Sequence, residues 1–498
     1  MRKIIVLLLC VVMVLGVFTG CRTSIDNNDD SSQETETTTS TASSDTTDAR
    51  LVPDVPEITF NGYQFRILTK GKTSSTWYSV DIDAESMTGE PINDAVYARN
   101  SKIEELYDIE IIEESPSSPD VAATTALTAQ NDFYDMIALR MNDHMEGLIN
   151  KGFMKDLNEV EYLDLTRPYY DQKSISELSI DGKNFAITGD LLTMDNDATR
   201  CVLFNKTIAD DIGIETIYNA DFYQLVESGK WTLDVLYECA KLAVQDKDGQ
   251  AGMNPDVDIY GMETEPFNSL VMLNSAGVRI VQKNEEDIPV YSLYTDKAIE
   301  VLQKIIPIQN DACMMLSTNY SGYTDVWTGL FHPTFTSNRS LFYMGQIQNA
   351  KMFRTFDVDF GILPIPKYDE SQEEYLSPVT TYGTDCISIP KIASNLERTA
   401  IIIEALSCES KYTVQPAYYE ATLKGKTAKD EESTVMLDLM FANRTFDLGY
   451  MYNWGGSYDA IYALTKTNST SITSTLKSIQ VTAEREIAAT VSAIMNQQ

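Results

Sequence analysis

Short apolar segments alternate with helical patterns in the first part of the chain. Residues 63–69 alternate apolar and polar side chains, as a half-buried strand does. Apolar residues between 92 and 106 keep helical spacing, and residues 109–112 return to a strand pattern. With residues 132–139 as a third strand, this succession predicts an α/β lobe built on a parallel sheet.

Two later apolar runs, residues 360–365 and 385–389, predict buried strands. Prolines bound both runs, and proline marks where the pairing of a strand stops. The segment between them has no helical period and carries four acidic residues at 369–374, so we expect it at the surface. The chain then enters the second strand through Thr-Thr-Tyr-Gly at 380–383.

Capping residues mark two helices in the second half. Thr232 and Thr295 each precede a helical stripe of apolar residues, and we expect Pro307 to end the second helix. The chain after about residue 433 is mostly helical in pattern, with Trp454-Gly455-Gly456 as an interruption.

The N-terminus has the pattern of a lipoprotein leader. Arg2 and Lys3 precede an apolar run up to Phe18, and small residues then lead to Cys21. The run is shorter than the roughly 20 residues that a membrane-spanning helix needs, which favours cleavage over an uncleaved anchor. We therefore expect residues 1–20 to be a signal peptide and Cys21 to carry the lipid, palmitate included, that anchors the protein to the outer side of the cell membrane.

Residues 21–55 predict a flexible tether. Serine and threonine make up 14 of the 29 residues between Arg22 and Arg50, with scattered acids and almost no apolar side chains. Such a segment cannot bury enough surface to fold.

Length, net charge and cysteine content limit which classes of protein this chain can belong to. A chain of 498 residues suggests two or three domains, and its net charge of −36 excludes nucleic acid as a partner. Apart from Cys10 in the leader and Cys21, the chain has five widely spaced cysteines, which give no disulfide framework. Of these, Cys239, Cys386 and Cys408 stand at apolar positions and are expected in the core.

Signatures of catalysis are missing from the sequence. Its two histidines, His144 and His332, cannot supply a zinc site, and no GxSxG, Walker or GxGxxG pattern is present. A pair of carboxylates for glycoside hydrolysis is not excluded by spacing alone. Asp246, Asp248, Asp256 and Asp258 lie in a glycine-containing loop that does not meet the EF-hand template, so a surface turn is favoured over calcium. We expect no catalytic residue, metal or cofactor.

Fragments along most of the chain resemble the extracellular solute-binding proteins (family 1) of bacterial ABC importers, which include the maltose-binding type. In order they are TGEPINDAVYARNSKIEELYDIEI (88–112), DFYDMIAL (132–139), GFMKDLNEV (152–160), FNK (204–206), GKWTLDVL (229–236), the stretch 361–390 and the tail around Trp454. The resemblance implies the fold class: α/β, a two-lobed periplasmic-binding-protein-like fold (type II), each lobe a mostly parallel sheet flanked by helices, with the ligand cleft between the lobes. It places lobe 1 at 56–194 and 381–432, lobe 2 at 195–380, and a C-terminal helical segment at 433–498 that packs mainly on lobe 2.

The resemblance also implies where a ligand would be bound. Trp77 lies on a loop that carries ligand contacts in the family, and Trp454 stands where the maltose-binding type has a stacking tryptophan; packing is the alternative for both. The shared motif around Trp231 marks that residue as core. The polar or aromatic candidates follow strands or border the crossings between lobes, and a structural hydrogen bond is an equal alternative for them. The expected ligand-binding residues are Trp77, Arg140, Asn142, Asp190, Tyr343, Gln346, Gln348, Tyr382, Asp385 and Trp454.

These observations predict a substrate-binding lipoprotein of an ABC importer, a monomer and not an enzyme. It would capture an extracellular carbohydrate, an oligosaccharide rather than a single sugar, and deliver it to the permease subunits. Three alternatives stay open: a binding protein for a peptide or another polar solute, a sensor or adhesin that feeds no transporter, and a secreted carbohydrate-active hydrolase.

Overall fold

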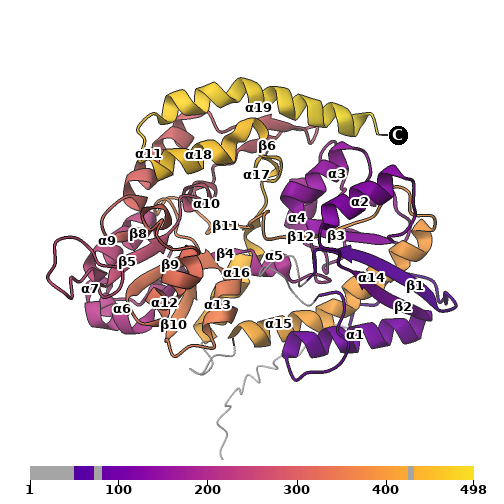
Figure 1. Cartoon of the computed structure of the whole chain (residues 1–498), viewed down its shortest axis with the longest axis horizontal. Helices are drawn as coiled ribbons and strands as arrows, with labels where there is room; N and C mark the ends of the chain where they lie inside the picture. Colours follow the sequence, from indigo (N-terminus) through magenta and orange to yellow (C-terminus); the bar gives the residue numbers. More distant parts are fainter. Residues whose placement is uncertain (1–49, 72–80, 424–430, 498) are drawn as a thin grey trace, which may run out of the picture. The chain divides into compact units, whose positions relative to one another are not determined.

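A four-stranded sheet forms from the first part of the chain and one strand that returns to it (Figure 1). The computed structural model describes residues 50–71, 81–423 and 431–497. β1 runs parallel to β2 and β3, whereas the last strand, β12, pairs antiparallel with β3. The strands predicted at 63–69 and 109–112 are confirmed. The sheet order is β12 (Asp385–Ser388), β3 (Met136–Arg140), β1 (Tyr63–Thr69) and β2 (Ile109–Glu114).

Several sequence predictions concern segments that are not described. The leader, the lipidated Cys21, the tether up to residue 49 and Trp77 all lie outside the described residues.

Helices cover both faces of the first sheet (Figure 1). Successive side chains of a strand point to opposite faces, so Phe65 and Ile67 pack with α1 (Pro91–Tyr107) and α14 (Leu396–Tyr412). On the other face, Leu68 packs toward α2 (Pro119–Thr128). Burial on both faces explains why β3 is almost continuously apolar, whereas β1 and β2 carry polar side chains at their less buried positions.

The second sheet has five strands and is mixed. β5 is parallel to β8 and β9, while β4 is antiparallel to both of its neighbours. β4 is therefore the one reversed strand of this sheet. The order is β10 (Phe360–Leu363), β4 (Arg200–Asn205), β9 (Ser340–Gln346), β5 (Tyr260–Thr264) and β8 (Met314–Leu316).

Trp231 lies in the core of the second lobe, as predicted. Its side chain is fully buried, and the indole N–H donates to the carbonyl of Pro364 at 2.9 Å. The rings of Phe222 and Phe342 lie 5.4 and 5.6 Å from it. This contact ties α8 (Phe222–Glu227) to the face of β9.

Two segments connect the sheets and touch each other at both ends: residues 187–199 are the outward crossing, and residues 379–387 are the return crossing. Ile187 and Ile387 exchange backbone hydrogen bonds of 3.1 and 2.7 Å, and Thr199 forms an antiparallel bridge with Val379. A third stretch joins them, because β11 (Ser377–Pro378) pairs with β13 (Arg444–Thr445). The lobe boundaries near residues 194 and 380 stay predictions.

The two capped helices begin where the sequence places them. The hydroxyls of Thr232 and Thr295 accept the N–H groups that open α9 (Leu233–Ala243) and α11 (Asp296–Gln309). The prediction that Pro307 ends α11 is wrong, because the helix continues to Gln309. Pro307 occupies the last turn, where it removes a single backbone hydrogen bond.

The end of the chain is helical, with the expected interruption. Gly455 and Gly456 have φ angles of 68° and 67°, which form a tight turn after Trp454. The final helix, α19 (Ile472–Met495), contacts α11 and also α3 (Glu146–Asn150), so it touches elements of both lobes.

The remaining elements are mostly short. No helix in the described part of the chain is both long and apolar enough to cross a membrane. Cys201, Cys239, Cys313, Cys386 and Cys408 are buried free thiols, which confirms three predicted core cysteines. The other elements are α4 (Gln172–Leu178), α5 (Met194–Asp197), α6 (Lys206–Ile212), α7 (Ile214–Tyr218), α10 (Asn268–Ser275), α12 (His332–Thr336), α13 (Ile347–Phe353), α15 (Val414–Leu423), α16 (Glu431–Ala442), α17 (Leu448–Tyr452), α18 (Ser457–Lys466), β6 (Val281–Lys283) and β7 (Pro289–Tyr291).

Candidate ligand-binding site

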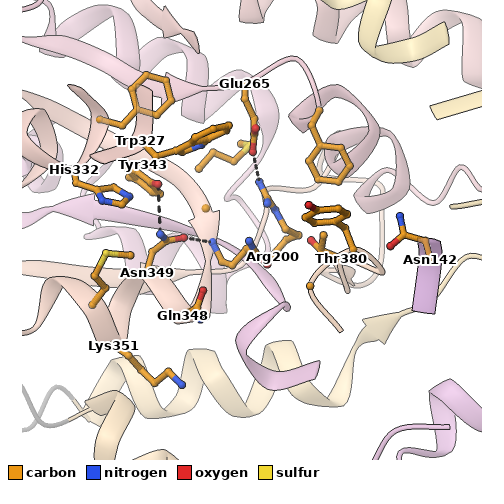
Figure 2. A pocket seen from close by; sticks show the side chains of 18 of the residues that line it. Asn142, Arg200, Glu265, Trp327, His332, Tyr343, Gln348, Asn349, Lys351 and Thr380 are labelled. Atoms are coloured by element: carbon orange, nitrogen blue, oxygen red, sulfur yellow. Dashed lines mark hydrogen bonds and ion pairs between the residues drawn. The ribbon is translucent and has the colours of Figure 1, made fainter. Parts of the chain in front are cut away.

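A large cavity opens where the ends of the second-sheet strands face the first lobe (Figure 2). Its volume is about 1430 Å³. Its walls come from three parts of the protein: residues 88–93 and 142–146 of the first lobe, residues 200–352 of the second, and residues 450–459 of the C-terminal segment. Residues 380–383 of the return crossing complete the lining.

One wall of the cavity is a group of aromatic rings from the C-terminal segment and its neighbours. Tyr450 and Tyr458 stack with ring centroids 6.1 Å apart, and Phe267 packs 5.4 Å from Tyr450. Tyr382, which is 52% exposed, adds a further ring from the return crossing. The guanidinium of Arg140 lies over that ring at 4.4 Å and fixes its orientation.

A second aromatic group lines the cavity from the second lobe. Trp327 begins a π-helical turn, η4 (Trp327–Phe331), and is 44% exposed. The carboxylate of Asp325 accepts the backbone N–H of Trp327 at 3.0 Å and holds the start of this turn. Tyr343, on β9, packs edge-to-face against Phe331 and also lines the cavity.

Amide groups stand near the second aromatic group. The Asn349 side chain donates to the Tyr343 hydroxyl at 3.4 Å and accepts the backbone N–H of Gln346 at 2.9 Å (Figure 2). Gln348 also lines the cavity. Across the cavity, Asn142 has a buried side-chain oxygen that accepts no hydrogen bond from the described residues. These groups offer both donors and acceptors to a polar ligand.

Charged groups complete the lining. Arg200 lies 3.8 Å from Glu265 in the middle of the view in Figure 2. Burial raises the pKa of the Glu265 carboxyl, and the charge of Arg200 opposes that rise. Burial also lowers the pKa of His332, so this imidazole is neutral at pH 7.

Five of the ten ligand residues expected from the sequence line this cavity. The structure brings them together from the first lobe, from β9 and the turn after it, and from the return crossing. They are Asn142, Tyr343, Gln346, Gln348 and Tyr382.

Trp454 does not line the cavity and is 3% exposed. Its ring stacks face to face on Tyr452, with centroids 4.6 Å apart, and its indole N–H donates to the Thr490 hydroxyl. Tyr452 is the ring that reaches the cavity lining. The expected stacking tryptophan is therefore a packing residue that supports a tyrosine.

Arg140, Asp190 and Asp385 also lie outside the lining. Arg140 contacts the ring of Tyr382, which does line the cavity. Asp385 is buried in an ion pair of 3.0 Å with Lys70. Asp190 lies 4.0 Å from Lys411, and burial raises the pKa of its carboxyl to about 7. All three lie in or next to the segments that connect the two sheets.

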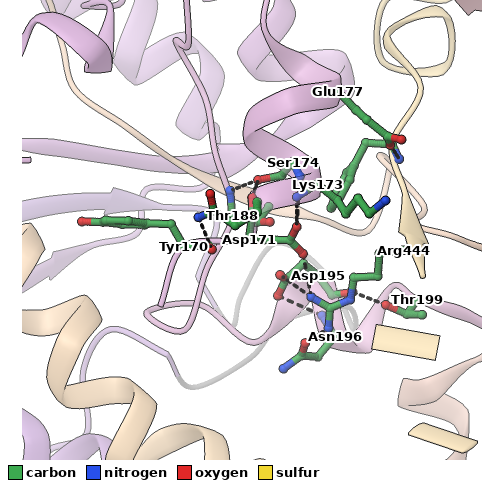
Figure 3. A network of polar contacts seen from close by, with 12 residues as sticks. Tyr170, Asp171, Lys173, Ser174, Glu177, Thr188, Asp195, Asn196, Thr199 and Arg444 are labelled. Carbon is green, nitrogen blue, oxygen red and sulfur yellow. Dashed lines mark hydrogen bonds and ion pairs between the residues drawn. The ribbon is translucent and has the colours of Figure 1, made fainter. Parts of the chain in front are cut away.

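A polar network centred on Arg444 lies next to these crossings (Figure 3). The guanidinium donates to Asp171 at 3.0 Å, to Asp195 at 3.1 Å and to the Asn196 amide oxygen. Burial raises the pKa of Asp195 to about 6, and Arg444 limits this rise. The network joins the N-terminus of α4, the outward crossing and β13.

Sequence reasoning missed several lining residues. Trp327 stands in a segment without clear periodicity, and Arg200 and Glu265 sit at strand ends like many other charged residues. For Arg200 and Glu265, the only signal in the sequence is their place at strand ends, because ligands of open α/β sheets bind beyond the strand ends.

The aspartate loop lies away from the cavity. Carboxylate oxygens of Asp246, Asp248 and Asp258 lie within 4.8 Å of one another. Asp258 accepts the backbone N–H groups of Lys247 and Asn254 at 2.7 and 2.6 Å. These hydrogen bonds are those of a turn, and the absence of calcium from this loop stays a prediction from the sequence.

No protein-family model matches the sequence, and a comparison with curated proteins finds no matching sequence. Solved structures do match the fold. They include an ABC substrate-binding protein from Listeria monocytogenes in complex with cycloalternan, with 12% identity and a TM-score of 0.54 over 86% of this chain and 99% of that chain. The maltose/maltodextrin-binding domain MalE from Bdellovibrio bacteriovorus, bound to maltotriose, has 15% identity and a TM-score of 0.53 over 85% and 100%.

A third similar structure holds a single sugar. It is an ABC transporter solute-binding protein from Thermotoga lettingae bound with α-D-tagatose, with 12% identity and a TM-score of 0.52 over 86% of this chain and 100% of that chain. These likenesses confirm the fold class expected from the sequence: two α/β lobes with the cleft between them.

Proposed function

We propose that this chain is the substrate-binding protein of an ABC importer and captures a carbohydrate in the cavity between its lobes. The observation that carries the proposal is the lining, in which two groups of aromatic rings face a shared space together with amide groups. Pyranose rings present an apolar face and a rim of hydroxyls, and this combination matches both. Similar folds hold maltotriose and cycloalternan, which supports the assignment.

The size of the cavity favours an oligosaccharide. Its volume of about 1430 Å³ exceeds the 300–1,000 Å³ that is usual for small-ligand sites. The two aromatic groups stand on different walls, so one ligand of several units would contact both.

The proposed ligand contacts combine sequence and structure. Closure of the lobes about the crossing segments would bury the ligand and present the closed form to the permease. We assign the lobes as 56–194 with 381–432 and 195–380, with 433–498 as the C-terminal segment. The proposed ligand residues are Trp77 from the sequence, Asn142, Tyr343, Gln346, Gln348 and Tyr382 from both, and Phe267, Trp327, Tyr450, Tyr452 and Tyr458 from the structure.

The cellular location of the protein is part of the same proposal. The leader and Cys21 support a lipid anchor on the outer side of the cell membrane, and the tether would let the binding domain reach the permease. Mass spectrometry of the membrane fraction tests it: an acylated N-terminal cysteine is expected, and an intact leader would contradict the anchor.

A thermal-shift screen tests the binding function. Ligand at a hundredfold excess over its Kd stabilises the folded state by about 2.7 kcal/mol, which raises the melting temperature measurably. We expect a shift with one family of oligosaccharides and none with amino acids or short peptides. A shift with peptides alone would contradict the carbohydrate assignment.

Trp327 gives the sharpest single-residue test. Its exposed ring lines the cavity, so Trp327→Ala should weaken oligosaccharide binding by about 1 kcal/mol, roughly fivefold in Kd, without lowering the stability of the fold. Isothermal titration calorimetry measures the change. Phe356→Ala is the matched control, because Phe356 is 46% exposed and lies outside the lining. Equal affinities of the two variants would remove Trp327 from the site.

A further inference from the structure

The positive charge of Arg200, which lines the cavity, is offset by a neighbouring carboxylate. The side chain of Arg200 is 3% exposed, and its Nη2 lies 3.8 Å from Oε1 of Glu265. The same guanidinium donates to the side-chain oxygen of Asn268. Arg200 thus meets the cavity with a carboxylate beside it, so its charge is offset before any ligand arrives.

The second cation of the lining is neutralised as well. Nζ of Lys351 lies 2.5 and 2.7 Å from the two carboxylate oxygens of Asp197, which is buried. Arg200 and Lys351 are the only lysine or arginine side chains among the described residues that line the cavity, and His332 is neutral at pH 7.

Carboxylates outnumber these cations around the cavity. Besides Glu265, the lining contains Glu90, Glu146, Asp325 and Asp459. Arg354 lies 3.6 Å from Glu90 and offsets that carboxylate, but the five acidic side chains of the lining still outnumber its two cations, so the cavity has a negative potential. The net charge of −36 on the whole chain has the same sign.

We infer that the ligand carries no negative charge: the cavity takes a neutral or amine-bearing oligosaccharide and rejects uronates and sulfated glycans, and Glu265 enforces this choice by neutralising Arg200. The inference rests on the proposed function and names the charge class of its carbohydrate. Uncharged hydroxyl groups can use Arg200 and Glu265 together, as a donor and an acceptor side by side. A ligand carboxylate would compete with Glu265 and meet the remaining acids.

Matched pairs of glycans test the charge class on the unaltered protein. Calorimetry compares gluco-, manno- and galactotrioses with the corresponding triuronates, and cellotriose with the chitosan trisaccharide. We expect a neutral or amine-bearing trisaccharide to bind and its triuronate to bind at least about tenfold more weakly. A triuronate that binds as tightly as its neutral partner overturns the inference and leaves the carbohydrate function standing. If neither neutral nor charged glycans bind, the proposed function falls and takes the inference with it.

Glu265→Gln tests the residue itself. The substitution keeps the shape of the side chain and leaves Arg200 with its full charge, so the affinity for the triuronate should rise at least about tenfold over the unaltered protein. Asp459→Asn is the matched control, since it also removes one carboxylate from the lining, but one that accepts a hydrogen bond of 2.9 Å from the neutral amide of Asn453. It should change triuronate affinity less than about threefold. Equal gains in the two variants would overturn the role of Glu265, and melting curves verify that both variants are folded.

Discussion

At the scale of single residues, Trp454 shows how an aromatic ring can matter to a binding site without touching it. The ring is 3% exposed and lies flat against Tyr452. Trp454→Ala should lower the free energy of unfolding by about 3–5 kcal/mol, since it removes a large buried side chain and leaves a cavity. Urea denaturation measures this loss. An unchanged unfolding midpoint would show that Trp454 is not the packing residue that its burial indicates.

Trp454 and Trp327 together show how far the role of a single residue can be predicted from the sequence. Composition and resemblance identify tryptophan as a candidate for stacking on a sugar. Which ring reaches the cavity depends on two neighbours that the sequence does not orient: Tyr452 covers Trp454, and the Asp325 hydrogen bonds turn Trp327 outward. The sequence therefore predicts stacking for Trp454, the supporting ring, which lies two positions from Tyr452 in the lining.

At the scale of elements, the outward crossing carries a titratable group that should respond near neutral pH. Asp190 is surrounded by Lys411, Asp195, Arg444 and Asp171, and burial raises its pKa to about 7. Its ordinary pKa is near 3.8. Between these values the folded state keeps a proton that the unfolded state releases, so this group makes the protein lose stability as pH rises from about 4 to 7.

Asp190→Asn removes that dependence and tests it. Relative to the unaltered protein, the variant should gain stability as pH rises from 5 to 8, with most of the gain reached by pH 7, because only the unaltered protein must ionise a buried carboxyl. Urea melts at pH 5, 6, 7 and 8 measure the difference. Asp211→Asn, on the exposed surface, is the control. A stability difference that does not change with pH would contradict the raised pKa.

Elements themselves were largely predictable. Strand β1 begins and ends where alternation places it, and Thr232 and Thr295 cap their helices, because these signals are local to a few residues. The prediction that Pro307 ends α11 is wrong, because the destabilisation that a proline causes in a helix depends on how many backbone hydrogen bonds follow it. In the last turn of α11 that number is small.

At the scale of the whole molecule, the two-lobed fold was within reach of the sequence and the composition of the cavity was not. Ordered fragments over most of the chain indicated the fold. The cavity, however, takes walls from residues more than 300 positions apart, such as Asn142 and Tyr458. Their meeting depends on the packing of the C-terminal segment across both lobes, which no local pattern encodes.

Arg444 connects α4, the outward crossing and β13, and its removal gives a prediction for the whole molecule. Arg444→Met leaves Asp171 and Asp195 buried without their cation, which should cost about 3–5 kcal/mol of unfolding free energy. The loss should be larger at pH 8 than at pH 5, because protonation of Asp195, whose pKa is already raised to about 6, relieves the unpaired charge. Adding Asp195→Asn to the variant should recover part of the loss at pH 8. Urea melts of the single and double variants at both pH values measure these terms, and a double variant no more stable than Arg444→Met would show that the uncompensated charge of Asp195 is not the cause.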